Sequence, residues 1–176
     1  MSAQLPNDDI LRGPAILNAI KDSGVETIVS VPDIVTSEGL LRLVSSDADI
    51  RHVPLCKEDE GISICTALSY CGKRSLLMMQ QTGMYDSVNS IRAIAVGYGH
   101  PVCMLIGLQG AEAGVPPNES DKHIVRVAQP VLDALEVEHH LLSYASDVDK
   151  IKPAIDKAYE TSRPVALLVG AMLPPA

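Results

Sequence analysis

The sequence predicts an α/β fold, a doubly wound six-stranded parallel sheet flanked by helices, and three observations support this prediction. Short apolar runs rich in β-branched residues alternate along the chain with segments of helical period. Hydrophobic residues make up 47% of the chain, enough for a buried core, although there is no Phe or Trp. The length of 176 residues suits one compact domain. We therefore expect residues 1–176 to form a single domain with short flexible tails at both ends.

The apolar runs define the predicted strands. They are Glu26 to Val31, Ile50 to Leu55, Ser75 to Gln80, Pro101 to Leu108, His139 to Tyr144 and Pro164 to Gly170. Strands that alternate with helices pair in parallel, and helices then cover both faces of the sheet.

The segments between the strands define the predicted helices. They run from about Asp8 to Asp22, Ser37 to Ser46, Lys57 to Cys71, Thr82 to Tyr98, Asp121 to Val137 and Val148 to Ser162. Gly24 tolerates the left-handed conformation that follows a helix, so it marks the end of the first one. In the fourth, Met84, Val88, Ile91 and Ala95 recur every three or four residues and form one apolar stripe.

Charge and the N-terminal sequence exclude several classes of partner. The formal net charge is -8 and the pI is near 5.0, without a compensating Lys/Arg cluster, so nucleic acid is not expected as a ligand. Residues Met1 to Asp9 lack the basic and apolar blocks of a signal peptide, and no apolar run reaches membrane-spanning length. We expect a cytoplasmic protein that does not contact membranes.

Cysteine and histidine spacing predicts no metal site. The four cysteines form no CxxC pair, and we interpret them as reduced thiols in the core. They are Cys56, Cys65, Cys71 and Cys103. His139 and His140 are adjacent on a predicted strand, so their side chains point to opposite faces and cannot share an ion easily.

Three strand-to-helix junctions are predicted to form a ligand-binding rim. They are Val31 to Asp33, Lys57 to Gly61 and Gln80 to Gly83, and each carries polar or flexible residues. Ligands of open α/β sheets bind outside the carboxyl ends of the strands, where such junctions lie. The long loop Gln109 to Ser120 also follows a strand, and loops of this length are often functional.

The acidic run from Glu58 to Glu60 has two explanations. Carboxylates are favoured in the first turn of any helix by the helix dipole, and spacing alone favours this structural explanation. Gly61 favours the second explanation, a functional role, because glycine lowers helix stability and lets another group approach the backbone closely. Glu60 would then lie at the boundary between rim and core, where a carboxyl group is partly desolvated.

Several motifs in order along the chain resemble the pyrimidine-binding domain of thiamine-diphosphate-dependent decarboxylases. They are Ser30 to Asp33, Glu60-Gly61, Ala67 to Lys73, and Met79 to Gly83 with Asn89. The resemblance covers nearly the whole chain and is greatest to the alpha subunit of sulfopyruvate decarboxylase and the matching half of phosphonopyruvate decarboxylase. It implies an enzyme subunit that acts in decarboxylation of a 2-oxoacid substrate.

The resemblance also implies roles for individual residues. The glutamate of the family's "NEG" or "EEG" motif bonds to the cofactor's pyrimidine ring nitrogen and shares a proton with it, and Glu60 matches this catalytic residue. Thr82, Gly83 and Met84 match the loop that packs against the pyrimidine ring. Asp33 matches a residue of the first loop on the substrate side.

Two segments depart from the family pattern. The family's "QNSGLGN" reads QQTGMYD from Gln80 to Asp86, with larger or acidic groups at its end. The arginine usual in the "WRGE" segment is replaced by Gln109, the second substrate-side candidate. A guanidinium can hold a sulfonate or phosphonate through paired charged donors, and an amide cannot. The departures leave the cofactor expectation intact and put the sulfopyruvate or phosphonopyruvate substrate in doubt.

The diphosphate half of the expected site is missing from the chain. Family members hold the diphosphate through Mg²⁺ bound by a GDG motif and a later asparagine on a separate domain, and this chain contains no GDG. The resemblance therefore implies a diphosphate-binding beta subunit that holds Mg²⁺. We expect an αβ pair that self-associates into a larger hetero-oligomer such as α2β2.

Two other function classes remain open at this stage. A thiamine-diphosphate carboligase of the same split design would join an acyl unit to an aldehyde. A non-catalytic flavodoxin-like binding domain would share only the fold, with Glu60 a helix-start acid.

Overall fold

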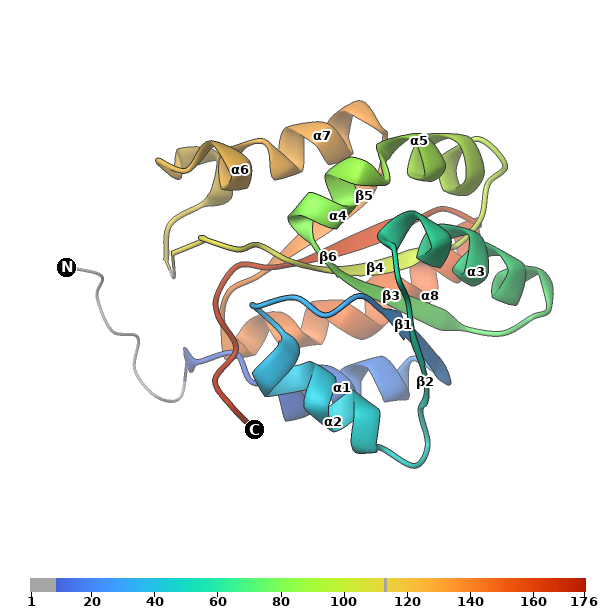
Figure 1. The fold of residues 1–176 in the computed structure, drawn as a ribbon, viewed down its shortest axis with the longest axis horizontal. Coiled ribbons are helices and arrows are strands. Elements are labelled where there is room, and N and C mark those ends of the chain that lie inside the picture. The colour runs from blue at the N-terminus through green and yellow to red at the C-terminus, as the bar shows by residue number, and fades with distance from the viewer. Residues whose placement is uncertain (1–8, 113) are drawn as a thin grey trace.

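The computed structural model describes residues 9–112 and 114–176, and it contains a six-stranded parallel sheet with helices on both faces (Figure 1). The strand order is β2-β1-β3-β4-β6-β5, and every neighbouring pair is parallel. The strands are β1 Thr27–Ser30, β2 Arg51–Pro54, β3 Ser75–Gln80, β4 Cys103–Gly107, β5 Glu138–Leu142 and β6 Val165–Val169. The predicted fold class is confirmed.

The helices form two layers, one on each face of the sheet (Figure 1). One layer contains α1 Gly13–Asp22, η2 Ser37–Leu41, α2 Arg42–Ser46, η5 Ala145–Lys150 and α8 Ile151–Thr161. The other contains α3 Glu58–Tyr70, α4 Gln81–Asp86, α5 Val88–Ser90, η3 Ile91–Val96, α6 His123–Arg126 and α7 Ala128–Ala134. A short helical turn, η4 Pro117–Glu119, precedes α6.

The central strands supply both cores because successive side chains point to opposite faces. On β3, Leu76 and Met78 pack in the core beneath α1 and α8, whereas Leu77 and Met79 pack beneath α3 and α4. All four side chains are buried. Such continuous burial is typical of a parallel strand covered on both faces.

Helix boundaries differ from the predictions where tertiary contacts intervene. The predicted start of the first helix at Asp8 lies outside the described residues, and α1 begins only at Gly13. Ile10 instead pairs with Tyr144 in an antiparallel bridge, and Pro14 occupies the first turn, where a missing N–H costs nothing. Gly24 follows α1 with a φ of 78°, as predicted.

Two long predicted helices are divided in the structure. The segment predicted as one helix from Thr82 to Tyr98 is divided among α4, α5 and η3. Of its predicted stripe, Met84, Ile91 and Ala95 are fully buried, whereas Val88 is only half-buried. The Asp121 to Val137 helix is shorter than predicted. It is divided between α6 and α7 and ends before Glu136, which has a φ of 56°.

The cysteine prediction is half right. Cys65 and Cys103 are buried, and burial raises the pKa of the Cys65 thiol to about 11. Cys56 and Cys71 are exposed because they lie in the β2–α3 junction and at the end of α3. Within the described residues, no group of three or more His, Cys, Asp or Glu side chains is placed to hold a metal ion.

The predicted flexible N-terminal tail falls on residues outside the described ranges. At the other end, Leu173 is buried and its N–H donates to the carbonyl of Val35 over 3.1 Å. Flexibility of the C-terminal tail stays a prediction. None of the helices within the described ranges is long and apolar enough to cross a membrane.

Candidate functional site

The three predicted junctions lie side by side at one edge of the sheet. They follow β2, β1 and β3, which are neighbours in a parallel sheet, so their carboxyl ends meet. The loop after β4 is next to them, because β4 pairs with β3. The structure therefore gathers the predicted site segments along the carboxyl edge.

Gly61 explains why α3 begins so close to the sheet. A β-carbon at Gly61 would lie 2.5 Å from Cδ1 of Leu77 and 2.9 Å from Cδ1 of Leu55. The group that approaches the glycine backbone is thus the side chain of a neighbouring strand. This contact presses the first turn of α3, with its three acidic residues, against the carboxyl end of β3.

The three acids of that turn occupy different environments. Glu60 is exposed, whereas Glu58 is half-buried and lies against the next junction, where a β-carbon at Gly83 would be 2.3 Å from its Cγ, Cδ and Oε1 atoms. Asp59 lies between them, with one carboxylate oxygen buried and unpartnered and the other 3.3 Å from Nζ of Lys57. The position between the rim and the core, which was expected for Glu60, is therefore occupied by Glu58.

Within the described residues, the carboxylates of Glu58 and Glu60 make no hydrogen bond and no ion pair. Lys57, the residue before the run, adopts an extended conformation and does not cap the helix with its side chain. The carboxylates at this helix start are consequently available to a ligand or to a second protein.

The residues predicted to contact the pyrimidine ring also differ in placement. Gly83 is buried, and its lack of a side chain leaves room for Glu58. Thr82 is exposed at the edge. Met84 is fully buried in the core beneath α3 and α4, so its side chain faces away from the rim. Thr82 can contribute contact surface, whereas Gly83 is covered by Glu58 and Met84 supports the turn from the core.

Asp33 uses its carboxylate within its own loop. One oxygen accepts hydrogen bonds from the backbone N–H groups of Val35 (2.6 Å) and Thr36 (3.0 Å), and the other accepts from the Thr36 hydroxyl. The residue is only 4% exposed, and burial raises the pKa of the carboxyl group despite these three bonds. Asp33 therefore shapes the loop that leads into η2, and a β-carbon at Gly107 would lie 2.6 Å from its Oδ1.

Gln81 is a site residue that the sequence analysis missed. Its side chain is fully buried; its amide N–H donates to the carbonyl of Gln109 (2.8 Å), and its amide oxygen accepts the N–H of Gln109 (2.9 Å). Gln80 also donates to the side-chain oxygen of Gln109. The paired glutamines after a strand were the available signal, but their partner lies 28 residues away along the chain.

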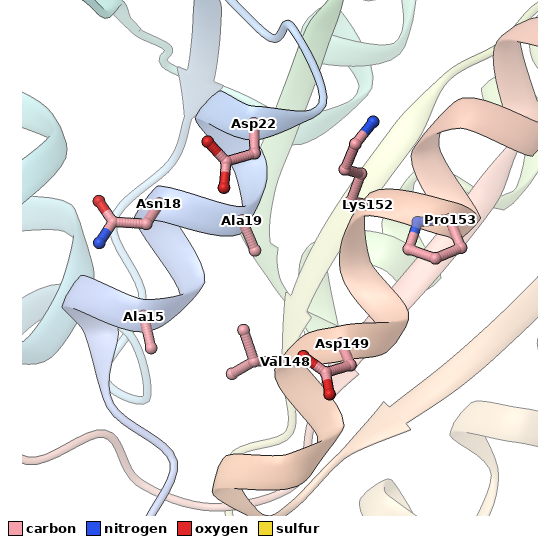
Figure 2. A pocket seen from close by; sticks show the side chains of 8 residues that line it. All are labelled: Ala15, Asn18, Ala19, Asp22, Val148, Asp149, Lys152 and Pro153. Carbon is pink, nitrogen blue, oxygen red and sulfur yellow. The ribbon is translucent and has the colours of Figure 1, made fainter.

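Two hollows differ in their relation to this edge. A cleft of about 530 Å³ lies between α1 on one side and η5 and α8 on the other, and no predicted site residue lines it (Figure 2). A smaller cavity of about 300 Å³ lies beside Gln109 at the carboxyl edge. The smaller cavity therefore belongs to the candidate site, and the larger cleft does not.

Comparison with known proteins identifies relatives that share one name. No protein-family model matches the chain. The chain is 31% identical over 159 residues to the sulfopyruvate decarboxylase subunit alpha of Methanocaldococcus jannaschii, a match that covers 90% of this chain and 92% of the relative. It is 29% identical over 164 residues to the subunit of the same name from Methanococcus maripaludis, covering 90% and 93%.

A third relative has a different length. The match to the sulfopyruvate decarboxylase of Methanosarcina acetivorans is 23% identical over 161 residues and covers 88% of this chain, but only 39% of the relative. The segment shared with this chain thus occurs both as a separate subunit and as part of a longer polypeptide.

Proposed function

The chain belongs to the family of sulfopyruvate decarboxylase alpha subunits, and we propose that it is the pyrimidine-binding subunit of a cytoplasmic, two-subunit, thiamine-diphosphate-dependent 2-oxoacid decarboxylase. The observation that carries the proposal is the pair of unpartnered carboxylates, Glu58 and Glu60, in the first turn of α3 beside Gly83 at the carboxyl edge. A pyrimidine ring needs a carboxyl group as a hydrogen-bonding partner, and this junction offers one beside the exposed Thr82.

The carboxyl group would hydrogen-bond to the ring nitrogen and exchange a proton with it. The family motif selects Glu60 for this role. The contact with Gly83 makes Glu58 the second candidate, because it is the carboxylate that faces the neighbouring junction. When bound, the cofactor supplies the electron sink that decarboxylation of a 2-oxoacid requires.

The chain's residues fit only the pyrimidine end of the cofactor. The sequence contains no GDG motif, and the Methanosarcina acetivorans relative extends well beyond the segment that it shares with this chain. We therefore assign Mg²⁺ and diphosphate binding to a beta subunit, with the site between the two subunits and the pairs self-associating as α2β2.

An exposed aromatic pair supports a covered surface near α3. Tyr70 ends α3 and Tyr98 follows η3, and both side chains are 80% exposed. Large exposed apolar groups on neighbouring elements are typical of protein interfaces. We propose that a partner subunit covers this face of α3 and η3.

Reconstitution tests the proposed function. The chain is purified alone and together with a candidate beta subunit that carries GDG, and carbon dioxide release from 2-oxoacids is measured. We expect activity only with both subunits, thiamine diphosphate and Mg²⁺, and weak cofactor binding by the chain alone. Tight Mg²⁺-dependent binding without a partner would refute the split site. Product analysis with an added aldehyde separates the decarboxylase from a carboligase.

A further inference from the structure

The cavity beside Gln109 is lined almost entirely by apolar residues. Its volume is about 300 Å³, and it lies among the loop after β1, the loop after β4 and the segment after β6. The lining residues are Ile34, Val35, Leu108, Gln109, Gly110, Ala111 and Met172. Only Gln109 among them carries a polar side chain, and none carries a charge. We call this hollow the side-group cavity.

Gln109 is held at this cavity by a fixed set of hydrogen bonds. The β3–β4 ladder ends where Gln80 pairs with Gly107. Beyond that point the buried amide of Gln81 continues the pairing, through its two bonds to the backbone of Gln109. Because Gln81 is two residues before Gly83, the same turn of α4 joins the side-group cavity to the acidic turn of α3.

Lys122 lies beside the cavity, but its ammonium group is bonded outside it. Nζ of Lys122 donates to the carbonyl of Gly110 (2.7 Å) and lies 3.3 Å from a carboxylate oxygen of Glu112. Lys122 is not among the lining residues. A sulfonate placed in the cavity would therefore lose its water without gaining a charged donor from the described lining residues, which is unfavourable.

We infer that the side-group cavity receives the side group of the 2-oxoacid and selects an uncharged, mainly apolar group over a sulfonate. The inference rests on the proposed function. It separates this chain from relatives that are named for a sulfonate-bearing substrate. Gln109 sets the polarity of the cavity, and Gln81 positions Gln109.

The test compares two substrates in the reconstituted complex. The values of kcat/KM are measured for 2-oxobutanoate and for sulfopyruvate, with wild-type chain and the variants Gln109→Arg and Lys122→Gln. We expect the wild type to prefer 2-oxobutanoate by about tenfold or more, the scale set by a few contacts in a pocket. Gln109→Arg should shift the ratio toward sulfopyruvate by a similar factor, because a guanidinium supplies paired charged donors. Lys122→Gln is the matched control and should leave the ratio unchanged.

Each other outcome has a separate meaning. Preference of the wild type for sulfopyruvate overturns the inference while the proposed function stands. An unchanged ratio in Gln109→Arg also overturns it, because the side group must then bind elsewhere, and so does a changed ratio in Lys122→Gln. If the complex decarboxylates no 2-oxoacid, the proposed function fails and this inference falls with it.

Discussion

The loop after β1 and the first turn of α3 both place acidic residues at the carboxyl edge, yet the two regions use them differently. Asp33 in the loop is buried, and its carboxylate accepts three hydrogen bonds from Val35 and Thr36. Glu58 and Glu60 in the α3 turn have no hydrogen-bonding partner within the described part of the chain. An acid whose bonds are satisfied internally supports the fold, whereas one left without partners at a rim can serve a ligand.

Among the variants that leave Glu58 and Glu60 unchanged, the largest effect is expected from Gly83→Ala, which tests the functional side of this comparison. The new β-carbon would lie 2.3 Å from the Glu58 side chain, so that carboxylate must move. Because misplacement by about 1 Å can cost about 100-fold in rate, we expect kcat in the complex to fall by roughly 10- to 100-fold. The fold should survive, since a flexible side chain can give way. Ser63→Ala, on the exposed side of α3, is the control, and equal turnover in both variants would contradict the expectation.

Gly61→Ala should damage the fold instead of the chemistry. Its β-carbon would meet Leu77 and Leu55 at 2.5 and 2.9 Å inside a packed core. Overpacking of this kind costs about 1–3 kcal/mol, against which the better helix propensity of alanine returns up to about 1 kcal/mol. Urea unfolding of the isolated chain measures the net loss. An unchanged free energy of unfolding would show that α3 can shift away from β3 at no cost.

Asp33 offers the converse test in the loop after β1. Asp33→Ala removes the acceptor for three hydrogen bonds and leaves buried donors without a partner, which costs about 1–3 kcal/mol of stability. Asp33→Asn keeps a carbonyl acceptor for the backbone N–H groups and should lose much less. Asp33→Asn could also keep wild-type stability but lose most of its activity in the complex. That result would show that Asp33 acts on the substrate, and it would contradict the distinction between a structural acid in the loop and functional acids in α3.

The smallest effect is a pH dependence of stability that arises from Asp33. Burial raises its pKa in the folded protein above the ordinary value of 3.8. Its contribution to stability is therefore greatest below pH 3.8 and declines as the pH rises through the folded-state pKa, by less than about 1.4 kcal/mol per pH unit. Unfolding of the wild type relative to Asp33→Asn, measured from about pH 3.5 upward, should show this decline. If the wild type instead gained stability relative to Asp33→Asn over the same pH interval, the pKa of Asp33 would be lowered by folding and not raised.

The fold could be predicted because its determinants are local. Apolar runs of strand length alternate with helical segments, so the element order and the parallel sheet follow from the sequence. The start of α1 could not be predicted, because the pairing of Ile10 with Tyr144 joins residues far apart in the chain.

The sequence predicted which segments meet at the carboxyl edge, but not which of their side chains face one another. Successive helical residues are rotated by about 100°, so a motif with three consecutive acids does not show which carboxylate faces the neighbouring junction. In the structure that residue is Glu58, while Glu60 is exposed. The pairing of Gln81 with Gln109 was missed for a similar reason, because it depends on which strands are neighbours.

The central claim is that a carboxyl group of the α3 turn exchanges a proton during catalysis. Turnover of the reconstituted complex with Glu60→Gln and with Glu58→Gln tests it most directly, since glutamine keeps size and hydrogen bonding but cannot exchange the proton. We predict that kcat falls by roughly two to four orders of magnitude in one of the two variants, while folding and partner binding stay intact. The family motif predicts that this variant is Glu60→Gln. The same loss in Glu58→Gln alone would move the role to the residue packed on Gly83. Near-normal turnover in both variants would contradict the claim.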